Sequence, residues 1–561
     1  MRRAAIHSRQ IIRGVLAAIL AHCPAAAGTE TLTYVLRPVR ESGRIEVELA
    51  WETQGRDASA LCVSPRWGAV ADIPLLVADV QVSGGTLTGQ EGACWMVEHR
   101  HGALLRVRYT VDGGRLTFDW DSVHLPITTR TFFHGVGNTF LLVPRPGGGA
   151  PEEYEVALRW RVPEGWEAVC SWAAGRHVGA RLKVDDLRHS VYVAGELVLH
   201  TARVEGAESL TVAMPDRFAF KVEAFAELAA AIIGPQCAFM EDRTFPPFVV
   251  TAIPVGEPLG EGQTRLSGTG LYRSFALFVP PEARLGEPVE HLFAHENFHH
   301  WNGQVLRAAE PQGEVYWFTE GFTDYYALRI LHESGRWSAA TYADWINRHL
   351  RAYHSNPARN ARNAEIAAGY WTQRDTVGEV PYQRGLLLGL RWHRLARDRS
   401  RVGGLDALFK ALVARGRDGG FQLTNEAVRQ TGSRLLGDWF ADDFDRYVVR
   451  AETVDVPPNA LAPDLTGKIQ ATYAYELGFD RERSLGQQRI VGLVAGSAAA
   501  KAGLREGDEL AGWSIYGDSD RKTVLRVLRG GEVKTVAYFP RGERIDVLQF
   551  RPARGGTGAG R

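Results

Sequence analysis

Two histidines four residues apart constrain this chain more than any other feature. If they lie in a helix, their side chains share one face and can bind the same metal ion. Pro288 suits the first turn of that helix, where its missing N–H group is not needed. His295 and His299 then lie about one turn apart on the same face, where two neutral imidazoles can hold one zinc ion. Glu296, next to His295, leans over the bound water as a general base and completes an HExxH motif. Histidines are also common on helix surfaces, so the motif alone does not establish a metal site.

A third ligand is expected from Glu320, which follows His299 after a gap of twenty residues. A catalytic zinc site uses three protein ligands and keeps one position open. Glu320 begins a second predicted helix that ends near Gly335, and Asp324 follows one turn later on the same face. Asp324 is placed to orient a ligand histidine by accepting its second N–H. The alternatives are a favourable first-turn acid for Glu320 and a solvated helix residue for Asp324.

Hydrolysis at such a site also needs a group that stabilises the developing oxyanion, and Tyr382 is the candidate. It lies in the segment 380–387, downstream of both predicted helices. Composition alone favours an ordinary core tyrosine at this position.

The pattern along the chain indicates several domains, as its length of 561 residues also suggests. Residues 31–200 alternate apolar and polar side chains between turn signals, which predicts an antiparallel β-sandwich. From about Phe218 to Arg450 the pattern is mostly helical, and a proline-rich linker then precedes a strand-rich unit. The predicted fold class is multidomain α+β, with a leader at 1–27, an N-terminal β domain at 28–215, a mostly helical domain at 216–455, a C-terminal domain at 465–552 and a disordered tail at 553–561.

The N-terminus has the order of a secretory signal peptide. Arginines at 2, 3, 9 and 13 precede an apolar run at 15–21 and the small residues 25–27, so we expect cleavage near Ala27 and a periplasmic or secreted protein. In an oxidising compartment the remaining cysteines can form up to two disulfides with three possible connectivities: Cys62, Cys94, Cys170 and Cys237.

Charge and hydropathy narrow the range of partners. The 65 basic residues balance 65 acidic ones, which argues against a nucleic-acid partner held by bulk electrostatics. No stretch reaches eighteen consecutive apolar residues, so we expect no membrane span in the mature chain.

The segments around His295, Glu320 and Tyr382 resemble the gluzincin clan of metallopeptidases, which includes the large zinc (M1) aminopeptidases. The gap to Glu320, the Trp301-Asn302 pair after the motif and the domain order are more similar to the glycyl aminopeptidase (M61) family. That resemblance covers essentially the whole mature chain. It implies a thermolysin-like catalytic domain between an N-terminal β domain and a C-terminal PDZ domain.

The resemblance also assigns roles to residues. It implies one zinc ion held by His295, His299 and Glu320, with Glu296 activating water and Tyr382 stabilising the oxyanion. Arg384 stands where the family usually has a lysine, and it keeps the positive charge.

One stretch departs from the family pattern. Members usually carry a strand whose glutamate grips the free α-amine of the substrate, and the corresponding residues here are 268–274. Tyr272 stands where that glutamate is expected and Arg273 follows it, with Gly270 on the same candidate substrate-binding strand. A phenol offers no charge and an arginine repels an ammonium group, so the resemblance does not extend to amino-terminal recognition. Arg273 either favours an acidic group on the substrate or pairs internally with a carboxylate.

The C-terminal unit resembles a PDZ domain of bacterial proteases over residues 496–510. Leu477, Gly478 and Phe479 look like the loop whose backbone N–H groups capture a peptide C-terminus. We expect either strand addition of a substrate tail beside this loop or a domain that only packs on the catalytic one.

Together these features predict an exported zinc metallopeptidase that acts on peptide or protein substrates and resembles aminopeptidases. Two alternatives stay open: an endopeptidase, which the missing amine anchor permits, and a peptide-binding protein that does not cut. The intact motif and Glu320 weigh against the binding protein, whereas Tyr272 and Arg273 weigh for it.

Overall fold

The computed structural model describes residues 30–553 apart from positions 55, 69, 117–122, 147–150, 257–265 and 400–402. The chain divides into two compact units, Met1–Glu196 and Leu197–Arg561, and each is described by itself. The predicted leader lies outside the described residues, as does the predicted tail beyond residue 553. The domain boundaries placed at 215 and 455 stay predictions.

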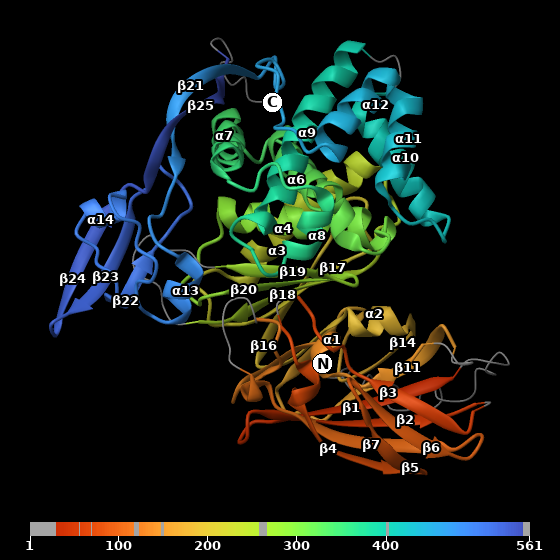
Figure 1. Ribbon diagram of the computed structural model, residues 1–561. Coiled ribbons are helices and arrows are strands. Elements are labelled where there is room, and N and C mark those ends of the chain that lie inside the picture. Colours follow the sequence, from red (N-terminus) through yellow and green to blue (C-terminus); the bar gives the residue numbers. More distant parts are fainter. Residues whose placement is uncertain are drawn as a thin grey trace, which may run out of the picture. The chain divides into compact units, whose positions relative to one another are not determined.

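Three sheets build the first unit, at the red and orange end of the colour scale in Figure 1. Their strand orders are β14-β11-β1-β2-β7-β4, β10-β3-β6-β5 and β13-β12-β15-β9-β8. In β2 the alternating residues Ile45, Val47, Leu49 and Trp51 are buried while their neighbours face outward, as one-sided burial of a strand requires. The strands are β1 (Thr31–Val39), β2 (Arg44–Glu52), β3 (Ala58–Cys62), β4 (Val77–Ser83), β5 (Gly85–Glu91), β6 (Cys94–His99), β7 (Leu104–Val111), β8 (Ile127–Thr128), β9 (Phe132–Val136), β10 (Val143–Pro144), β11 (Glu153–Trp160), β12 (Glu167–Cys170), β13 (Ala173–Ala174), β14 (His177–Lys183) and β15 (Val191–Gly195), with the short helices α1 (Gly137–Phe140) and α2 (Val184–Arg188).

One ladder corrects the prediction of a purely antiparallel sandwich. β1 pairs parallel with β11, with Thr31 opposite Glu155, whereas β2 pairs antiparallel with both β1 and β7. β1 and β11 are far apart in the chain, so the connection between them is long enough for both to run in the same direction. Local alternation predicts which face of a strand is buried, but it does not predict the direction of a distant neighbour.

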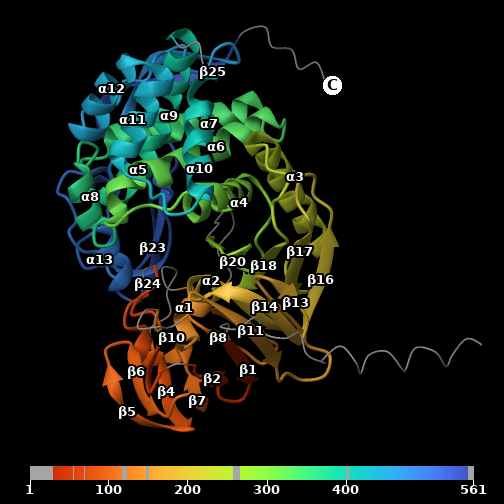
Figure 2. The same ribbon diagram turned by 90° about the vertical axis from the view of Figure 1, so that its right-hand side faces the viewer.

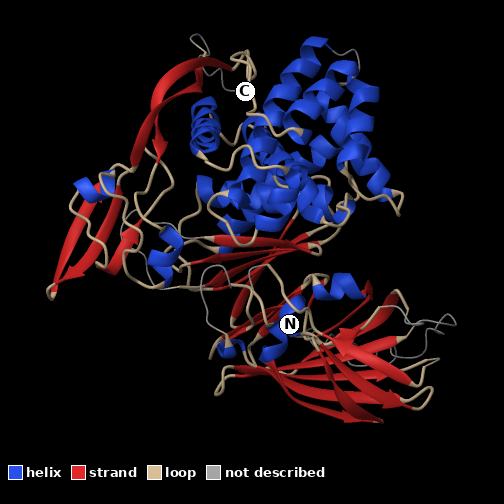
Figure 3. Ribbon diagram, in the orientation of Figure 1, coloured by secondary structure: helices blue, strands red, loops and turns tan. Residues whose placement is uncertain are grey.

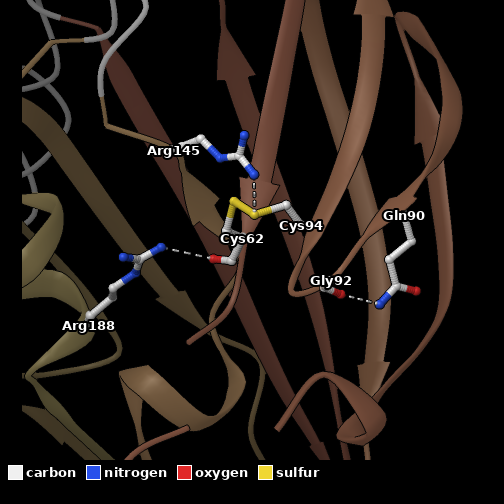
Figure 4. The surroundings of a disulfide bond; sticks show 6 residues. All are labelled: Cys62, Gln90, Gly92, Cys94, Arg145 and Arg188. Carbon is white, nitrogen blue, oxygen red and sulfur yellow. Dashed lines mark hydrogen bonds between the residues drawn. A yellow bond between two sulfur atoms is a disulfide. The ribbon is translucent and has the colours of Figure 1, made fainter. Parts of the chain in front are cut away.

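The structure selects one of the possible cysteine pairings. Cys62 in β3 is bonded to Cys94 in β6, and the two residues face each other in the strand register. Figure 4 shows this bond with the Arg145 guanidinium donating to Cys94 Sγ at 3.0 Å. Cys170 and Cys237 are buried free thiols, and burial raises the pKa of each to about 12.

A mixed five-stranded sheet begins the second unit, in the order β16-β17-β18-β20-β19. β17, β18 and β20 are parallel, whereas the edge strand β19 forms an antiparallel hairpin with β20. Every residue of β20 is buried, as expected of a parallel strand covered on both faces. The strands are β16 (Leu197–Ala202), β17 (Leu210–Pro215), β18 (Phe248–Pro254), β19 (Ser267–Leu271) and β20 (Ser274–Val279).

Helix α3 (Val222–Met240) packs against α4 (Glu287–Phe298). Gln236 of α3 donates to the Ala294 carbonyl at 2.7 Å and accepts from Asn297 at 2.6 Å. These two hydrogen bonds hold α4 against α3. By length and composition α3 is the one helix among the described residues that is apolar enough to cross a membrane. More than half of its apolar window (56%) is buried inside the fold, as in a core helix.

The remaining helices form the layer drawn in blue in Figure 3 and in green to cyan in Figure 2. Aromatic side chains fill their shared core, where the Phe298 ring stacks on Tyr326 and on Phe409 with centroids 5.3 and 5.4 Å apart. The helices are α5 (Tyr316–Thr319), α6 (Gly321–Glu333), α7 (Ala339–Ser355), α8 (Asn363–Gly369), α9 (Val380–Arg399), α10 (Gly404–Arg417), α11 (Asn425–Leu436) and α12 (Asp438–Phe444).

The C-terminal segment is strand-rich, as predicted. β21 pairs antiparallel with β25, and β22, β23 and β24 form a separate three-stranded sheet. Asn347 of α7 donates to the Phe550 carbonyl of β25 at 2.9 Å, which ties this segment to the helices. The elements are β21 (Leu465–Tyr475), α13 (Arg481–Gly486), α14 (Ala498–Lys501), β22 (Glu509–Ser514), β23 (Thr523–Arg529), β24 (Glu532–Tyr538) and β25 (Arg541–Pro552).

Candidate active site

The two histidines of the motif lie at the C-terminal end of α4. Pro288 is in the first turn of this helix and His299 is its C-terminal cap residue. The rings of His295 and His299 are 4.7 Å apart, and both point to the same side of the helix. The i, i+4 spacing thus brings the two imidazoles together.

Glu320 completes the cluster from the junction between α5 and α6. Nε2 of His295 and Nε2 of His299 are 3.0 Å apart, and Oε2 of Glu320 is 3.4 Å from each of them. A tetrahedral ion with bonds of about 2.0–2.1 Å would hold its ligand atoms about 3.3 Å apart. Two imidazole nitrogens and one carboxylate oxygen at these separations fit a zinc ion with one position left open.

The outer nitrogen of each imidazole has its own partner. Nδ1 of His295 bonds to Oδ1 of Asp324 at 2.8 Å, and Nδ1 of His299 donates to the Asn302 carbonyl at 3.0 Å. Asn302 is itself fully buried and donates to the Phe318 and Thr319 carbonyls, just before Glu320. These bonds fix the tautomers so that both Nε2 atoms face Glu320.

A third histidine belongs to this network and was not singled out from the sequence. Nε2 of His291 bonds to the same Oδ1 of Asp324 at 2.9 Å, so one carboxylate oxygen serves two histidines. The ring of His291 packs on Trp345 of α7, with centroids 4.5 Å apart. The sequence feature that indicates this role of His291 is its position four residues before His295, on the same helix face.

Glu296 is positioned by the hairpin opposite α4. Its Oε2 accepts a 2.6 Å hydrogen bond from the Gly270 N–H in β19, which leaves Oε1 available. A Cβ at position 270 would lie 2.7 Å from the Glu296 carbonyl oxygen, so only glycine permits this approach. Gly270 therefore lies against Glu296, and its role in substrate binding stays a prediction.

The buried acids favour positive charge between the imidazoles. Burial by itself lowers the pKa of His295, but the carboxylates of Asp324 and Glu320 raise it well above its usual value. The pKa of His299 is raised in the same way by Glu320, against the effect of burial. Burial raises the pKa of Glu296, and the two histidines oppose that rise. A divalent cation would supply the positive charge that this cluster favours.

Tyr382 lies in the first turn of α9, with its ring 5.9 Å from that of His295. Two glycines allow this proximity, because a Cβ at Gly385 would lie 1.8 Å from the Trp317 carbonyl oxygen and one at Gly321 2.4 Å from the Gly385 Cα. Burial raises the pKa of Tyr382 well above its usual value, and Glu320 raises it further. The phenol therefore stays protonated and can donate a hydrogen bond.

Arg384 does not face the site. It is fully buried, and its guanidinium donates to the carbonyls of Arg359 at 2.8 Å and Ala361 at 2.6 Å. The positive charge at this position therefore holds the chain before α8 rather than a reacting group.

Tyr272 and Arg273 form the turn between β19 and β20. Arg273 has a positive φ of 48°, and its guanidinium lies 5.0 Å from the Tyr272 ring centre. Both side chains are half-buried. No carboxylate among the described residues forms an ion pair with Arg273, so the expected internal partner is not found there.

The loop with Leu477, Gly478 and Phe479 lies in the C-terminal segment. Leu477 and Phe479 are buried in its apolar core, and Gly478 has a φ of 85°. The next element is helix α13, not a strand. The role of this loop stays a prediction.

Comparisons with known proteins agree with this geometry. Residues 289–380 match the model of the M61 glycyl aminopeptidase family. A search of curated protein sequences finds no significant match. The solved structure of an aminopeptidase N family protein from Idiomarina loihiensis is similar with a TM-score of 0.69 at 16% identity, covering 92% of this chain and 98% of that one. An M1 zinc metallopeptidase from Deinococcus radiodurans gives a TM-score of 0.48 at 15% identity, covering 77% of this chain and 94% of that one.

The matched segment contains His295, His299 and Glu320, and the aminopeptidase N family structure shares the fold of nearly the whole chain. The C-terminal segment, whose PDZ resemblance stays a prediction, lies outside the family match. The chain is a zinc metallopeptidase whose metal-binding segment is similar to the M61 glycyl aminopeptidases.

Proposed function

We propose that this chain is an exported peptidase that hydrolyses peptide bonds with Glu296 as the general base. One observation carries the proposal: the ligand atoms of His295, His299 and Glu320 lie within 4.8 Å of one another, with Glu296 on the same helix turn. The cluster has the composition of a catalytic zinc site with one open position.

The proton transfers follow from the residues around the cluster. A zinc ion held there would polarise the scissile carbonyl and lower the pKa of water. Glu296 accepts the proton of the attacking water and then donates it to the nitrogen of the leaving amine. The Gly270 N–H holds one Glu296 oxygen at 2.6 Å, so the other oxygen is the one that receives the proton. The Tyr382 phenol donates to the carbonyl oxygen as negative charge develops on it.

The proposed mode is removal of residues from the amino end, by similarity of the metal-binding segment to the M61 glycyl aminopeptidases. One observation favours an endopeptidase instead. Tyr272 and Arg273 follow Gly270 in the β19–β20 hairpin, where the Gly270 N–H contacts Glu296, and neither side chain can neutralise a substrate ammonium group.

A cleavage assay on matched peptides separates these modes. The wild-type chain and Glu296→Gln are incubated with one peptide set in free-amine and N-acetylated forms, and products are identified by mass spectrometry. Trimming of free-amine peptides alone supports the aminopeptidase, and internal cuts in both forms support the endopeptidase. Absence of Glu296-dependent cleavage would leave a peptide-binding protein. Glu287→Gln is the matched control, because Glu287 lies on the same helix at its exposed first turn.

Export is proposed from the leader together with the Cys62–Cys94 bond, since disulfides persist mainly in oxidising compartments. Cell fractionation and the mass of the mature chain test it. A cytosolic chain that keeps residues 1–27 would contradict export.

A second binding role is proposed for the C-terminal segment, as a PDZ domain that captures a peptide C-terminus. The support is the loop itself: the N–H groups of Leu477, Gly478 and Phe479 donate to no other described residue. Fluorescence anisotropy with one peptide as a free carboxylate and as an amide tests this role. Equal binding of the two forms would contradict carboxylate capture.

A further inference from the structure

Tyr370 is a second tyrosine at the candidate site and the direct partner of Tyr382. Their hydroxyl oxygens are 2.8 Å apart. Tyr370 follows α8 directly and is only 5% exposed, so packing fixes its ring. The ring contacts Tyr316 with centroids 4.5 Å apart and belongs to an apolar cluster with Ile366, Val377 and Val380.

The loop from Tyr370 to the start of α9 is folded back tightly. A Cβ at Gly378 would lie 2.9 Å from the Tyr370 carbonyl oxygen. The Gly378 N–H donates to the Gln373 carbonyl at 3.0 Å, and Asn356 of α7 donates to the Thr376 carbonyl at 3.0 Å. The position of the Tyr370 hydroxyl is therefore set by backbone contacts as well as by its ring.

Arg374 lies on the other side of Tyr370. Its guanidinium carbon is 4.8 Å from the ring centre of Tyr370 and 5.1 Å from that of Trp371. Burial raises the pKa of Tyr370 and the Glu320 carboxylate raises it further, whereas the charge of the Arg374 guanidinium lowers it. The Arg374 guanidinium therefore packs over the Tyr370 ring.

A phenol has one proton, so a Tyr382 hydroxyl that donates to the substrate can only accept from Tyr370, which gives the 2.8 Å contact a direction. Tyr370 then directs its own proton to the Tyr382 oxygen. The Tyr382 proton is then left to point away from Tyr370, on the side where the His295 ring lies 5.9 Å away.

We propose that Tyr370 is a positioning residue that donates to Tyr382 and thereby directs the Tyr382 proton toward the carbonyl oxygen of the substrate. The inference rests on the proposed role of Tyr382. Hydrogen bonds in series polarise one another, so the same contact strengthens Tyr382 as a donor.

A double-mutant cycle tests the inference with Tyr370→Phe, Tyr382→Phe and both together, because phenylalanine keeps each ring. We expect Tyr370→Phe to lower kcat about 3- to 10-fold, the range of one neutral hydrogen bond, with KM and zinc content unchanged. In the Tyr382→Phe background the same change should have no further effect on kcat.

Tyr325→Phe is the matched control. Tyr325 is also buried, and its hydroxyl accepts from Arg329 at 3.5 Å, but among the described residues no second hydroxyl bonds to it. Its kcat should stay within about two-fold of the wild-type value, since a core hydroxyl acts on stability rather than on the reaction.

The possible outcomes separate the two proposals. If Tyr382→Phe keeps the wild-type kcat, the proposed role of Tyr382 fails and this inference falls with it. If Tyr382→Phe lowers kcat but Tyr370→Phe behaves like Tyr325→Phe, only the inference is overturned. An equal loss from Tyr370→Phe in both backgrounds also overturns it, because the two hydroxyls then act independently.

Discussion

The α4–α6 side of the candidate site and the β19–β20 hairpin differ in how their residues are held. On the helical side each imidazole has a buried partner, Asp324 for His295 and the Asn302 carbonyl for His299. On the hairpin, Tyr272 and Arg273 are half-buried in a turn, and no described carboxylate pairs with Arg273. The proposed metal chemistry therefore depends on a closed network, whereas the proposed substrate selection depends on a turn that can change without disturbing that network.

The largest effect is expected from a substitution that displaces α9 from α5 and α6, on the helical side of the site. In Gly385→Ala the new Cβ would lie 1.8 Å from the Trp317 carbonyl oxygen, so α9 must separate from α5 and α6. We expect the free energy of unfolding to fall by about 3 kcal/mol or more, with weaker zinc binding. Urea denaturation measures the change. Gly486→Ala is the control, because a Cβ there meets nothing within 4 Å, and equal stability of the two variants would contradict the close approach.

Removing the shared carboxylate tests the network around the ligands. Asp324→Ala takes away the acceptor of His295 and His291, so zinc affinity should fall about 10- to 100-fold. Competition with a chromophoric chelator gives the dissociation constant. Asp344→Ala on α7 is the control, since its carboxylate is exposed and pairs only with Arg348. An unchanged affinity in Asp324→Ala would mean that this contact does not orient the ligand.

A substitution in the β19–β20 hairpin tests whether substrate binding can change while zinc binding stays the same. Tyr272→Glu places a carboxylate in the turn, and KM for free-amine peptides should fall about five-fold relative to N-acetylated ones, equal to roughly 1 kcal/mol. Zinc affinity should stay the same. Tyr272→Gln is the control, because glutamine has nearly the shape of glutamate but carries no charge. Loss of zinc in Tyr272→Glu would show that the two sides are not independent.

The smallest effect is expected from removing the charge of Asp242, whose carboxylate holds the segment that follows His299. Trp301 Nε1 and the Arg417 guanidinium donate to the Asp242 carboxylate at 2.9 and 2.6 Å. Burial raises the pKa of Asp242, but hydrogen bonds from Trp301 and Thr244 and the charge of Arg417 lower it overall below its usual value. A lowered folded-state pKa stabilises the protein above the pKa of the unfolded chain, and this contribution is lost as the pH falls below about 4.

Asp242→Asn should therefore cost about 1 kcal/mol at pH 7 and less at pH 3. Denaturation of both chains at the two pH values measures the difference. A cost that does not shrink in acid would assign the role of Asp242 to its shape rather than its charge.

Much of the ligand side could be predicted from the sequence. The spacing of His295 and His299 implies one helix face, and a glutamate at the start of a second helix is a frequent third ligand. Both patterns are local, because they depend on the period of a helix and on residue type. Asp324 could be predicted for the same reason, one turn after Glu320.

The remaining features depend on long-range contacts that no local pattern contains. Tyr370 reaches Tyr382 only because the loop folds back on Gly378, and Gly385 matters only because Trp317 lies against it. The burial of Arg384 and the parallel pairing of β1 with β11 also involve partners distant in the chain. The sequence gives the charge of Arg384, whereas only the fold shows that its guanidinium donates to the backbone carbonyls of Arg359 and Ala361.

The most direct test returns zinc to the chelator-stripped wild-type chain and to Glu296→Gln, with bound zinc and peptide cleavage measured in the same samples. The account predicts that both chains bind one zinc ion with similar affinity and that only the wild type cleaves, with less than about 1% of its kcat left in the variant. Comparable cleavage by Glu296→Gln, or no cleavage by the zinc-loaded wild type, would contradict Glu296 as the general base of a peptidase.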